Sequence, residues 1–355
     1  MDASLEPAST IQLSVIIPAR NEEDCLEECL RSLVRQSEET WLLGQDWEIV
    51  VVDDGSTDRT ASIASAIAGE FAGVTVMQAP ALEKGWTGKA NAVWAGAQAA
   101  RGAWLLFTDA DTIHEPGHLS RAIVEAERHK VAMLSYSPRQ IVSGLAQRAL
   151  MPLVFSELSI AYPPARVSDP ETHAAAANGQ FLLVQRDAYF ANGGHQGVRG
   201  AVLEDVELAG IFKRRKLGLR FRYAPDAVAT RMYRSFGTMF EGWTKNLALL
   251  FGNPLSLAAW RILDLVLLVG LPILTVVMYE RNLLPILVAA LVLIWIRNLW
   301  RFYRRVAKSN FPFKDCLITP LGLPLFSVLL YRSWFHHTIT KRVSWKGREY
   351  PSRGR

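Results

Sequence analysis

The chain has 355 residues, enough for one large domain and an appendage, and half of them are hydrophobic, with a mean hydropathy of +0.11 that is high for a soluble protein. Its net charge of +5 is unevenly spread, because residues 261–355 hold 15 Lys and Arg against 4 Asp and Glu, while the residues before them hold 24 against 30. A basic, apolar C-terminal region behind an acidic body favours a bilayer as partner and argues against nucleic acid.

The three cysteines do not form a disulfide framework or a zinc site. Cys25 and Cys29 are four residues apart and would share one face of a helix, and Cys316 stands far from both. We interpret Cys25 and Cys29 as packing thiols in a reducing compartment. Residues 1–10 lack the basic and apolar regions of a signal peptide, so we expect the first domain to stay in the cytoplasm.

Strands and helices alternate in the first third of the chain. Short apolar runs predict strands at residues 13–18, 48–52, 74–77 and 104–107, and helical patterns lie at residues 60–71 and 88–100. This order favours an α/β fold with a mostly parallel, Rossmann-like, doubly wound sheet. Such sheets bind ligands at the carboxyl ends of their strands.

Polar side chains follow the first two strands. The segment from Pro18 to Glu22 closes the first strand, and Asn21 can cap the helix after it. Asp53 and Asp54 follow the second strand, where a carboxylate can accept a hydrogen bond from uracil N3–H or from a ribose hydroxyl. The structural alternative is a helix N-cap, for example Asp58, and both roles can coexist.

A glycine-bearing loop at residues 84–88 leads into the helix that starts near Lys89. Its backbone amides and Lys89 could contact a diphosphate at the helix N-terminus. The spacing differs from that of the phosphate-binding loop of nucleotide hydrolases, and the alternative is a solvated turn.

Asp109 and Asp111 follow the apolar strand at residues 104–107. Alternate residues of a strand point to opposite faces, so the chain must turn there for both carboxylates to reach one ion. Carboxylate oxygens suit Mg²⁺ or Mn²⁺ held together with substrate phosphates. We expect Asp111 to bind the metal and Asp109 to contact ribose or sugar.

A second acidic motif, Glu204-Asp205, lies about 95 residues further along and precedes a helix predicted at residues 206–216. Asp205 could act as a general base. The alternative is an acidic pair in the first turn of a helix, where the helix dipole favours anions. The Pro- and Ala-rich stretch at residues 156–179 has no clear periodicity, and we interpret it as a loop on the acceptor side.

Further strands are predicted on either side of the acidic motif, at residues 133–137, 181–184 and 219–223. From Phe236 to Leu250 apolar residues then recur at helical spacing. This pattern predicts an amphipathic helix, which we expect to lie in a membrane interface rather than in a protein core.

Two apolar runs follow at residues 262–278 and 283–300, each nearly long enough to cross a bilayer, and a short polar link joins them. They predict a helical hairpin. The basic stretch from Arg297 to Lys308 places its ends on the cytoplasmic side. A third apolar run, residues 317–330, contains two prolines and precedes another basic segment, which favours a re-entrant or interfacial segment over a span.

Together these segments resemble the family 2 glycosyltransferases with a GT-A fold. The matching segments occur in the family's order across about residues 13–235, and they are Pro18 to Glu22, Asp53-Asp54-Gly55-Ser56, Gly88-Lys89-Ala90-Asn91, Asp109-Ala110-Asp111 and Glu204-Asp205. The resemblance implies a nucleotide-sugar donor (its uridine by resemblance alone), a divalent cation and inversion at the anomeric carbon.

The resemblance also implies a role for each matching residue. The donor would be bound by Pro18, Arg20, Glu22, Asp53, Asp54, Lys89, Asn91 and Asp109. The cation, Mn²⁺ or Mg²⁺, would be held by Asp111 with Asp109. Asp205 would be the catalytic base, with Glu204 beside it.

A narrower likeness concerns the C-terminal region. A catalytic domain, then Trp243 to Asn246, apolar helices and a closing Trp345 to Tyr350 resemble bacterial transferases associated with hopanoid and carotenoid biosynthesis. Processive synthases carry Q/R-x-x-R-W after the acidic pair, whereas residues 231–235 here end in Ser. This departure argues against polymer synthesis.

The sequence therefore predicts an inverting transfer of one sugar to a membrane lipid such as a hopanoid, a carotenoid or another glycolipid precursor. Transfer to a polyprenyl phosphate, a non-catalytic module that binds nucleotide sugars or lipids, and a membrane scaffold remain alternatives. We expect a catalytic domain at residues 1–233, an interfacial helix at 234–260, a membrane region at 261–335 and a basic cytoplasmic tail at 336–355. The catalytic domain would face the cytoplasm at the bacterial inner membrane.

Overall fold

The computed structural model describes residues 11–36, 40–281, 285–345 and 347–351. The chain forms two compact units. The N-terminal unit contains the residues up to Ile141 together with Pro164–Met232. The helical unit contains Val142–Pro163 together with the chain from Tyr233 onward. The helix within Val142–Pro163 thus belongs with the C-terminal helices, although the sequence assigned it to the catalytic domain.

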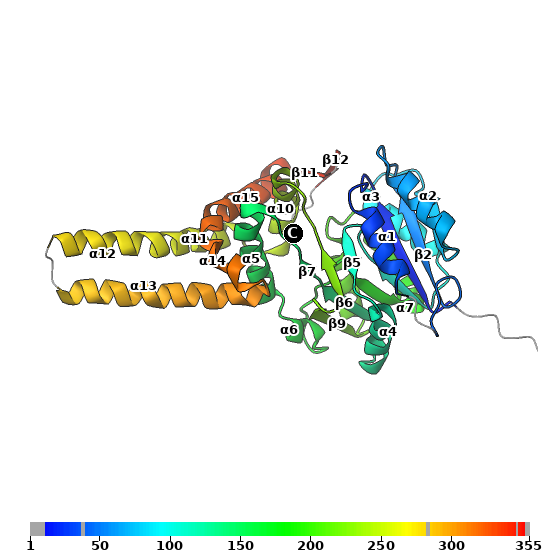
Figure 1. Cartoon of the computed structure of the whole chain (residues 1–355), viewed down its shortest axis with the longest axis horizontal. Coiled ribbons are helices and arrows are strands. Elements are labelled where there is room, and N and C mark those ends of the chain that lie inside the picture. The colour runs from blue at the N-terminus through cyan, green and yellow to red at the C-terminus, as the bar shows by residue number, and fades with distance from the viewer. Residues whose placement is uncertain (1–10, 37–39, 282–284, 346, 352–355) are drawn as a thin grey trace, which may run out of the picture. The chain divides into compact units, whose positions relative to one another are not determined.

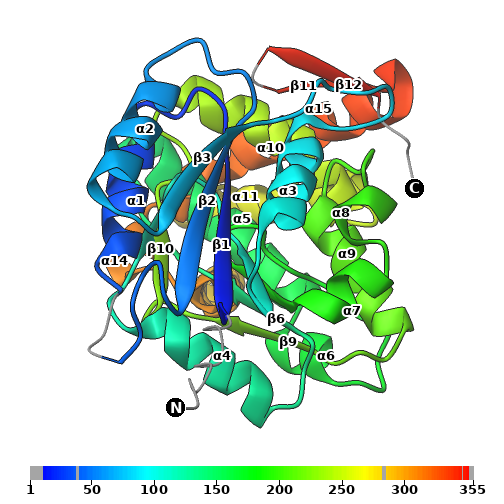
Figure 2. The same cartoon turned by 90° about the vertical axis from the view of Figure 1, so that its right-hand side faces the viewer.

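A seven-stranded sheet forms the centre of the N-terminal unit, in the order β3-β2-β1-β4-β8-β6-β9 (Figure 2). Only β8 runs antiparallel to its neighbours β4 and β6. The strands are β1 (Leu13–Ala19), β2 (Trp47–Asp53), β3 (Val74–Gln78), β4 (Trp104–Phe107), β6 (Met133–Ser137), β8 (Leu182–Gln185) and β9 (Leu219–Tyr223). The predicted α/β class with a mostly parallel sheet is confirmed.

Helices cover both faces of this sheet, which explains why all seven residues of β2 are buried (Figure 2). One face packs against α1 (Leu26–Val34), α2 (Thr60–Glu70) and α4 (His118–Arg128). The other packs against α3 (Gly88–Ala99), where a Cβ at Gly96 would lie 2.6 Å from Cγ2 of Ile16. This close approach fixes the position of α3 on the sheet. Lys89 lies in the first turn of α3 and is positioned together with it.

Smaller elements complete the N-terminal unit. They are a three-stranded sheet of β5 (Thr112–His114), β10 (Val228–Thr230) and β7 (Arg139–Gln140), and the helices α6 (Pro164–Ser168), α7 (Arg186–Ala191), α8 (Gly194–Gly197) and α9 (Glu204–Arg214). The predicted helix at residues 206–216 therefore begins at the acidic pair itself.

Two local predictions for this part of the chain are wrong. Asn21 does not cap α1, which begins at Leu26 after Cys25. Asn21 adopts the left-handed conformation, with φ of 52°, and its Oδ1 accepts a hydrogen bond from the amide of Thr57 at 2.9 Å. Residues 156–179 are not one loop, because they include the end of α5 (Gly144–Ala161) and all of α6.

The helical unit contains α5 and the chain from α10 onward. Its elements are α5 (Gly144–Ala161), α10 (Phe236–Leu250), α11 (Pro254–Leu265), η1 (Val266–Gly270), α12 (Leu271–Glu280), α13 (Pro285–Val306), η2 (Ala307–Ser309), α14 (Phe313–Leu317), η3 (Thr319–Gly322), α15 (Leu323–Phe335), η4 (His336–Thr340) and the hairpin β11 (Arg342–Trp345)–β12 (Arg348–Pro351).

The amphipathic helix α10 turns its apolar side into the protein. Met239, Trp243 and Leu247 are buried, and Nε1 of Trp243 donates to Sδ of Met151 on α5 at 3.3 Å. The core-packing alternative therefore describes this side of the helix, and a location of α10 at a membrane interface stays a prediction. Phe236, the first residue of α10, is not buried by these contacts and is 53% exposed.

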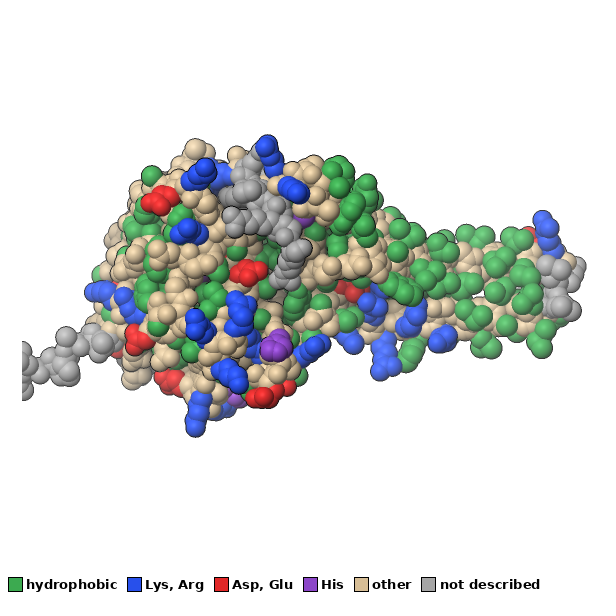
Figure 3. All heavy atoms as spheres, turned by 180° about the vertical axis from the view of Figure 1, so that it is seen from behind, with side chains coloured by type: hydrophobic (Ala, Val, Ile, Leu, Met, Phe, Trp, Pro, Cys, Tyr) green, Lys and Arg blue, Asp and Glu red, His purple; other side chains and the backbone are tan. Residues whose placement is uncertain are grey.

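Two helices of the described chain are long and apolar enough to cross a membrane, by length and composition (Figure 1). They are Pro254–Glu280, which joins α11, η1 and α12, and Pro285–Ser309. Their apolar side chains are exposed, as for Ile273 (60%) and Leu293 (67%), and they cover the hairpin in Figure 3. Asn282 of the predicted link, and Leu283 and Leu284 at the start of the second predicted apolar run, lie outside the described residues.

The third apolar run, residues 317–330, packs within the helical unit. Leu323, Phe326 and Leu329 of α15 are fully buried. Ser333 lies on the same helix and accepts a hydrogen bond from the amide of Ala248 on α10 at 2.8 Å. One side of α15 thus packs within the helical unit, while Leu321 and Val328 stay exposed, and the re-entrant or interfacial interpretation stays a prediction.

Candidate active site

The site lies at the carboxyl edge of the parallel strands. Ala19 and Asp53 are paired across β1 and β2, and β4 ends beside β1 with Phe107 opposite Ile16. Because parallel strands end at one edge, the residues that follow these three strands are brought together there. Asp109 is therefore near Pro18, although 91 positions separate them in the sequence.

Lys89 joins the two acidic motifs. Its Nζ lies 2.8 Å from Oδ1 of Asp109 and 3.0 Å from Oε1 of Glu204. Lys89 occupies the first turn of α3, which Thr87 caps by accepting a hydrogen bond from the amide of Ala90 at 3.2 Å. Burial alone would lower the pKa of Lys89, but the surrounding carboxylates raise it well above the usual value. The Lys89 ammonium therefore supplies the positive charge that holds these carboxylates together.

Asp205 is held by backbone amides. Its Oδ2 accepts from the amide of Gly179 and its Oδ1 from the amide of Val206, both at 2.8 Å. Burial, followed by the charge of Glu204, raises the pKa of Asp205 to about 6. A carboxylate with a pKa near the working pH is suited to general-base catalysis.

Glu204 behaves differently from its neighbour. Burial would raise its pKa, but Lys89 and backbone hydrogen bonding bring the pKa below the usual value. Two adjacent carboxyl groups whose environments separate their pKa values are typical of acid–base sites. Glu204 thus stays ionised and holds Lys89, while Asp205 can exchange a proton.

Gly179 allows this arrangement. A Cβ at this position would lie 2.9 Å from Nζ of Lys89 and 3.5 Å from Oδ2 of Asp205. The chain around it is fixed by Thr108, whose hydroxyl donates to the carbonyl of Gln180 at 2.8 Å. The end of β4 and the segment beside Asp205 are therefore held in one position.

His195 is a site residue that the sequence analysis missed. Its ring packs edge-on against Phe107, with ring centroids 4.9 Å apart, and its Nδ1 lies 2.8 Å from the hydroxyl of Tyr189. Burial lowers its pKa to about 4, so the ring is neutral at pH 7. His195 stands nine residues before Glu204, and no motif or characteristic spacing in the sequence marks it as a site residue.

These residues surround a small pocket. Its lining is Pro18, Lys89, Val93, Phe107, Thr108, Asp109, Gly179, Leu182, His195, Glu204 and Asp205. Five of the predicted site residues are thus in one place, and the pocket combines a cation, three carboxyl groups and a neutral imidazole.

Four other predicted residues form a second group, in the loops after β1 and β2. Arg20 donates from Nη1 to the carbonyl of Asp54 at 2.8 Å, and the amide of Glu22 donates to Oγ1 of Thr60 at 2.7 Å. Asp53 is 3% exposed and its Oδ1 accepts from the amide of Ser56 at 3.2 Å. The two loops are joined to each other, and this group does not line the small pocket.

Asn91 has a structural contact. It is 7% exposed, and its Nδ2 donates to the carbonyl of Pro80 at 2.8 Å. The side chain therefore fixes the loop before α3, whose Thr87 in turn donates from its amide to the carbonyl of Arg199 at 2.7 Å. A direct contact between Asn91 and a donor stays a prediction.

The chain turns between Asp109 and Asp111, as the sequence required. Oγ1 of Thr112 donates to the carbonyl of Asp109 at 2.7 Å, and the carbonyl of Asp111 accepts from the amide of Arg231 at 3.2 Å. Among the described residues no group of three or more His, Cys, Asp or Glu could hold a metal by itself. Two carboxylates nonetheless fit a Mg²⁺ or Mn²⁺ ion that takes its other ligands from phosphates and water.

Comparison with known proteins identifies the N-terminal part of the chain. Residues 14–190 match the model of glycosyl transferase family 2. A 4,4'-diaponeurosporenoate glycosyltransferase of Staphylococcus haemolyticus is 28% identical, and the match covers 98% of this chain and 91% of that protein. The protein of the same name from Staphylococcus aureus is 25% identical, over 95% of this chain and 88% of that one.

Solved structures of lower similarity were also found. A mannosyltransferase, PcManGT from Pyrobaculum calidifontis in complex with GDP-Man and Mn²⁺, is 18% identical, with 96% of this chain and 91% of that chain covered and a TM-score of 0.48. TarS of Staphylococcus aureus is 15% identical, with 96% of each chain covered and a TM-score of 0.44.

The contacts of Lys89 predict a pH-dependent loss of stability in Lys89→Met. Without the ammonium, the folded-state pKa of Glu204 loses the effect that lowers it and the pKa of Asp205 rises further above its unfolded value, so stability is kept at low pH and lost as pH rises. The unfolding temperature of the detergent-purified variant, measured by scanning fluorimetry, should fall further below wild type at pH 8 than at pH 5. Lys84→Met, which removes an exposed lysine of the preceding loop, is the control. An equal deficit at both pH values would contradict this role.

Proposed function

We propose that this protein, which belongs to glycosyl transferase family 2 and is a glycosyltransferase, moves one sugar from a UDP-linked donor to an apolar lipid acceptor at a membrane. The observation that carries the proposal is the joining of Asp109, Lys89 and Glu204 beside Asp205, whose pKa is about 6. This arrangement supplies a cation where a diphosphate would leave and a base where an acceptor would be deprotonated.

Asp205 is the proposed base. Its Oδ2 would take the proton from the acceptor as the acceptor oxygen attacks C1 of the sugar from the face opposite the diphosphate, which gives inversion. Its amide contacts with Gly179 and Val206 keep the carboxylate oriented in the meantime. Glu204 acts through Lys89, because it holds the ammonium next to Asp109.

The donor would be bound by both groups of residues. The loops that carry Arg20, Glu22, Asp53 and Asp54 would contact the uridine. Lys89 and the Asp109–Asp111 turn would contact the diphosphate. A divalent cation bound at this turn would offset the charge that develops on the leaving diphosphate.

The acceptor is proposed from the relatives. Both Staphylococcus proteins are named for a carotenoid carboxylate, 4,4'-diaponeurosporenoate, and we extend an apolar acceptor of the carotenoid kind to this chain. A carboxylic acid in apolar surroundings has a raised pKa. A base with a pKa of about 6 is therefore suited to such an acid as well as to a hydroxyl group.

The membrane location is supported by the helical unit. Helices Pro254–Glu280 and Pro285–Ser309 are long and apolar enough to cross a bilayer, and little of their surface is buried within the protein. The basic residues from Arg297 to Lys308 would then lie on the cytoplasmic side, together with the catalytic domain. An acceptor dissolved in that bilayer would not need to enter water.

A donor screen tests the proposed function. Detergent-purified protein with Mn²⁺, a panel of nucleotide sugars and a bacterial carotenoid extract should release nucleoside diphosphate with one UDP-sugar and only when the extract is present. Mass spectrometry of the product should show one added hexose. Release that requires a polyprenyl phosphate instead would identify the other acceptor class. Donor binding without release in any mixture would favour a non-catalytic module.

The Asp205→Asn variant should lose turnover by about 10²-fold or more, because general-base help is worth this much. Binding of UDP, measured by calorimetry, should be nearly unchanged, since the proposed base acts on the acceptor and not on the nucleotide. Glu207→Gln, two residues away on the exposed side of α9, is the matched control. Turnover near the wild-type value in Asp205→Asn would remove Asp205 from the mechanism.

The pH dependence of kcat/KM gives a separate test. Asp205 acts only when it is deprotonated, so the rate should fall as pH is lowered through about 6 and be level above it. The pH at which the rate falls should be higher if Lys89 is replaced, because the ammonium lowers the pKa of Asp205. A rate that is constant from pH 5 to pH 8 would exclude a base with this pKa.

A further inference from the structure

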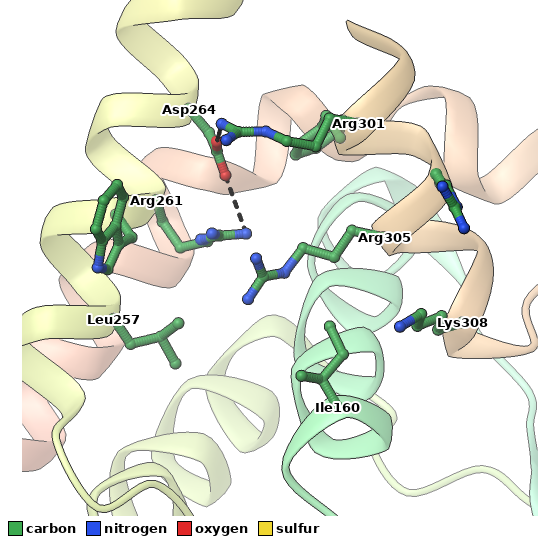
Figure 4. Close-up of a pocket in the computed structure, with 10 residues that line it drawn as sticks. Ile160, Leu257, Arg261, Asp264, Arg301, Arg305 and Lys308 are labelled. Carbon is green, nitrogen blue, oxygen red and sulfur yellow. Dashed lines mark hydrogen bonds and ion pairs between the residues drawn. The ribbon is translucent and has the colours of Figure 1, made fainter. Parts of the chain in front are cut away.

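A pocket of about 590 Å³ opens in the helical unit among α5, α11, α13 and η2 (Figure 4). Nothing in the proposed transfer reaction uses it. Part of its lining is apolar, namely Ile160, Leu257, Trp260 and Phe302. The rest is almost entirely basic.

Four of the basic residues come from one helical face. Arg301, Arg304, Arg305 and Lys308 are spaced at i, i+3, i+4 and i+7, which places them on one side of the helix. Arg261 of α11 is the fifth, and in Figure 4 it points toward Arg305 across the pocket.

Two carboxylates hold three of the arginines in place. Nη1 of Arg261 lies 3.0 Å from both Oε1 of Glu157 and Oδ2 of Asp264. Arg305 binds Glu157 at 2.8 and 2.7 Å, and Arg301 reaches Asp264 at 3.4 Å. The two shared carboxylates thus hold three guanidinium groups close together. Their ion pairs fix the positions of these side chains in the pocket wall.

The pocket still carries excess positive charge. Five cations against the two carboxylates leave a formal charge of +3. Among the described residues, Arg304 and Lys308 have no carboxylate within 4.0 Å, and the guanidinium of Arg304 lies over the ring of Trp300 at 5.0 Å. Nε of Arg261 is buried and has no hydrogen-bond partner in the described part of the chain.

The pocket lies where the surface of the hairpin changes character. On α13, exposed apolar side chains such as Ile286 and Leu293 give way to the basic face, and Figure 3 shows Lys and Arg gathered at this end of the apolar hairpin. Trp260 lines the pocket and is 56% exposed. Tryptophan and basic residues next to an apolar span are typical of the depth at which lipid headgroups lie.

We propose that this pocket binds the headgroup of an anionic membrane phospholipid, with its phosphate among Arg261, Arg304 and Lys308 and its glycerol region against Trp260. The excess charge matches an anionic headgroup, and the apolar wall matches the glycerol and acyl region. This inference uses the membrane location proposed above but not the transfer reaction, so either can fail without the other.

The test measures lipid binding to the full chain in detergent. Dioctanoyl phosphatidylglycerol should bind saturably and more tightly than dioctanoyl phosphatidylcholine. The double variant Arg304→Gln/Lys308→Gln should bind phosphatidylglycerol about 25-fold more weakly, roughly fivefold for each cation removed. These two residues are chosen because neither holds the buried carboxylates, so the variant should keep its fold.

The matched control is Arg297→Gln/Lys314→Gln, which removes the same charge from exposed positions that do not line the pocket. It should bind phosphatidylglycerol as wild type does. Equal binding of the two lipids, or an equal loss in both double variants, would overturn the proposal. Displacement of the lipid by millimolar inorganic phosphate would also overturn it, because the site would then serve a soluble phosphate.

Discussion

The candidate site depends on the ion pairs of a single ammonium group, Nζ of Lys89. Asp109, Glu204 and Asp205 come from two distant parts of the chain, and three carboxyl groups this close would repel one another without a cation between them. Lys89 lowers the free-energy cost of bringing the three carboxyl groups together. The pKa values of Glu204 and Asp205 beside it shift in opposite directions. Glu204 stays charged, whereas the pKa of Asp205 rises to about 6.

The geometry that delivers Lys89 is itself a packing result. Its helix α3 lies on the sheet through Gly96, which approaches Ile16 too closely for any larger residue to fit without a shift. The same closeness recurs at Gly179, where a side chain would meet both Lys89 and Asp205. Two small residues thus set the positions of a cation and a base, although neither takes part in the chemistry.

The helical unit also contains a cluster of like charges that is held together by shared counter-ions. Glu157 and Asp264 hold Arg261, Arg301 and Arg305 close to one another, as the ammonium of Lys89 holds carboxylates. In the N-terminal unit the excess of like charge is acidic and surrounds one cation. In the helical unit the excess is basic and surrounds two carboxylates, which suits an anionic ligand at the end of an apolar hairpin.

The sequence by itself determined the strands of the seven-stranded sheet, the α/β class and the two acidic motifs, because burial on both faces produces unbroken apolar runs and chemistry at a parallel sheet follows strand ends. It also located the apolar hairpin, since length and composition decide whether a helix can cross a bilayer. Only the tertiary structure decided which carboxyl groups share Lys89, that His195 and Gly179 belong to the site, and that Met239, Trp243 and Leu247 face protein. These outcomes depend on contacts between residues far apart in the chain, and local periodicity carries no information about the partner that a side chain will meet.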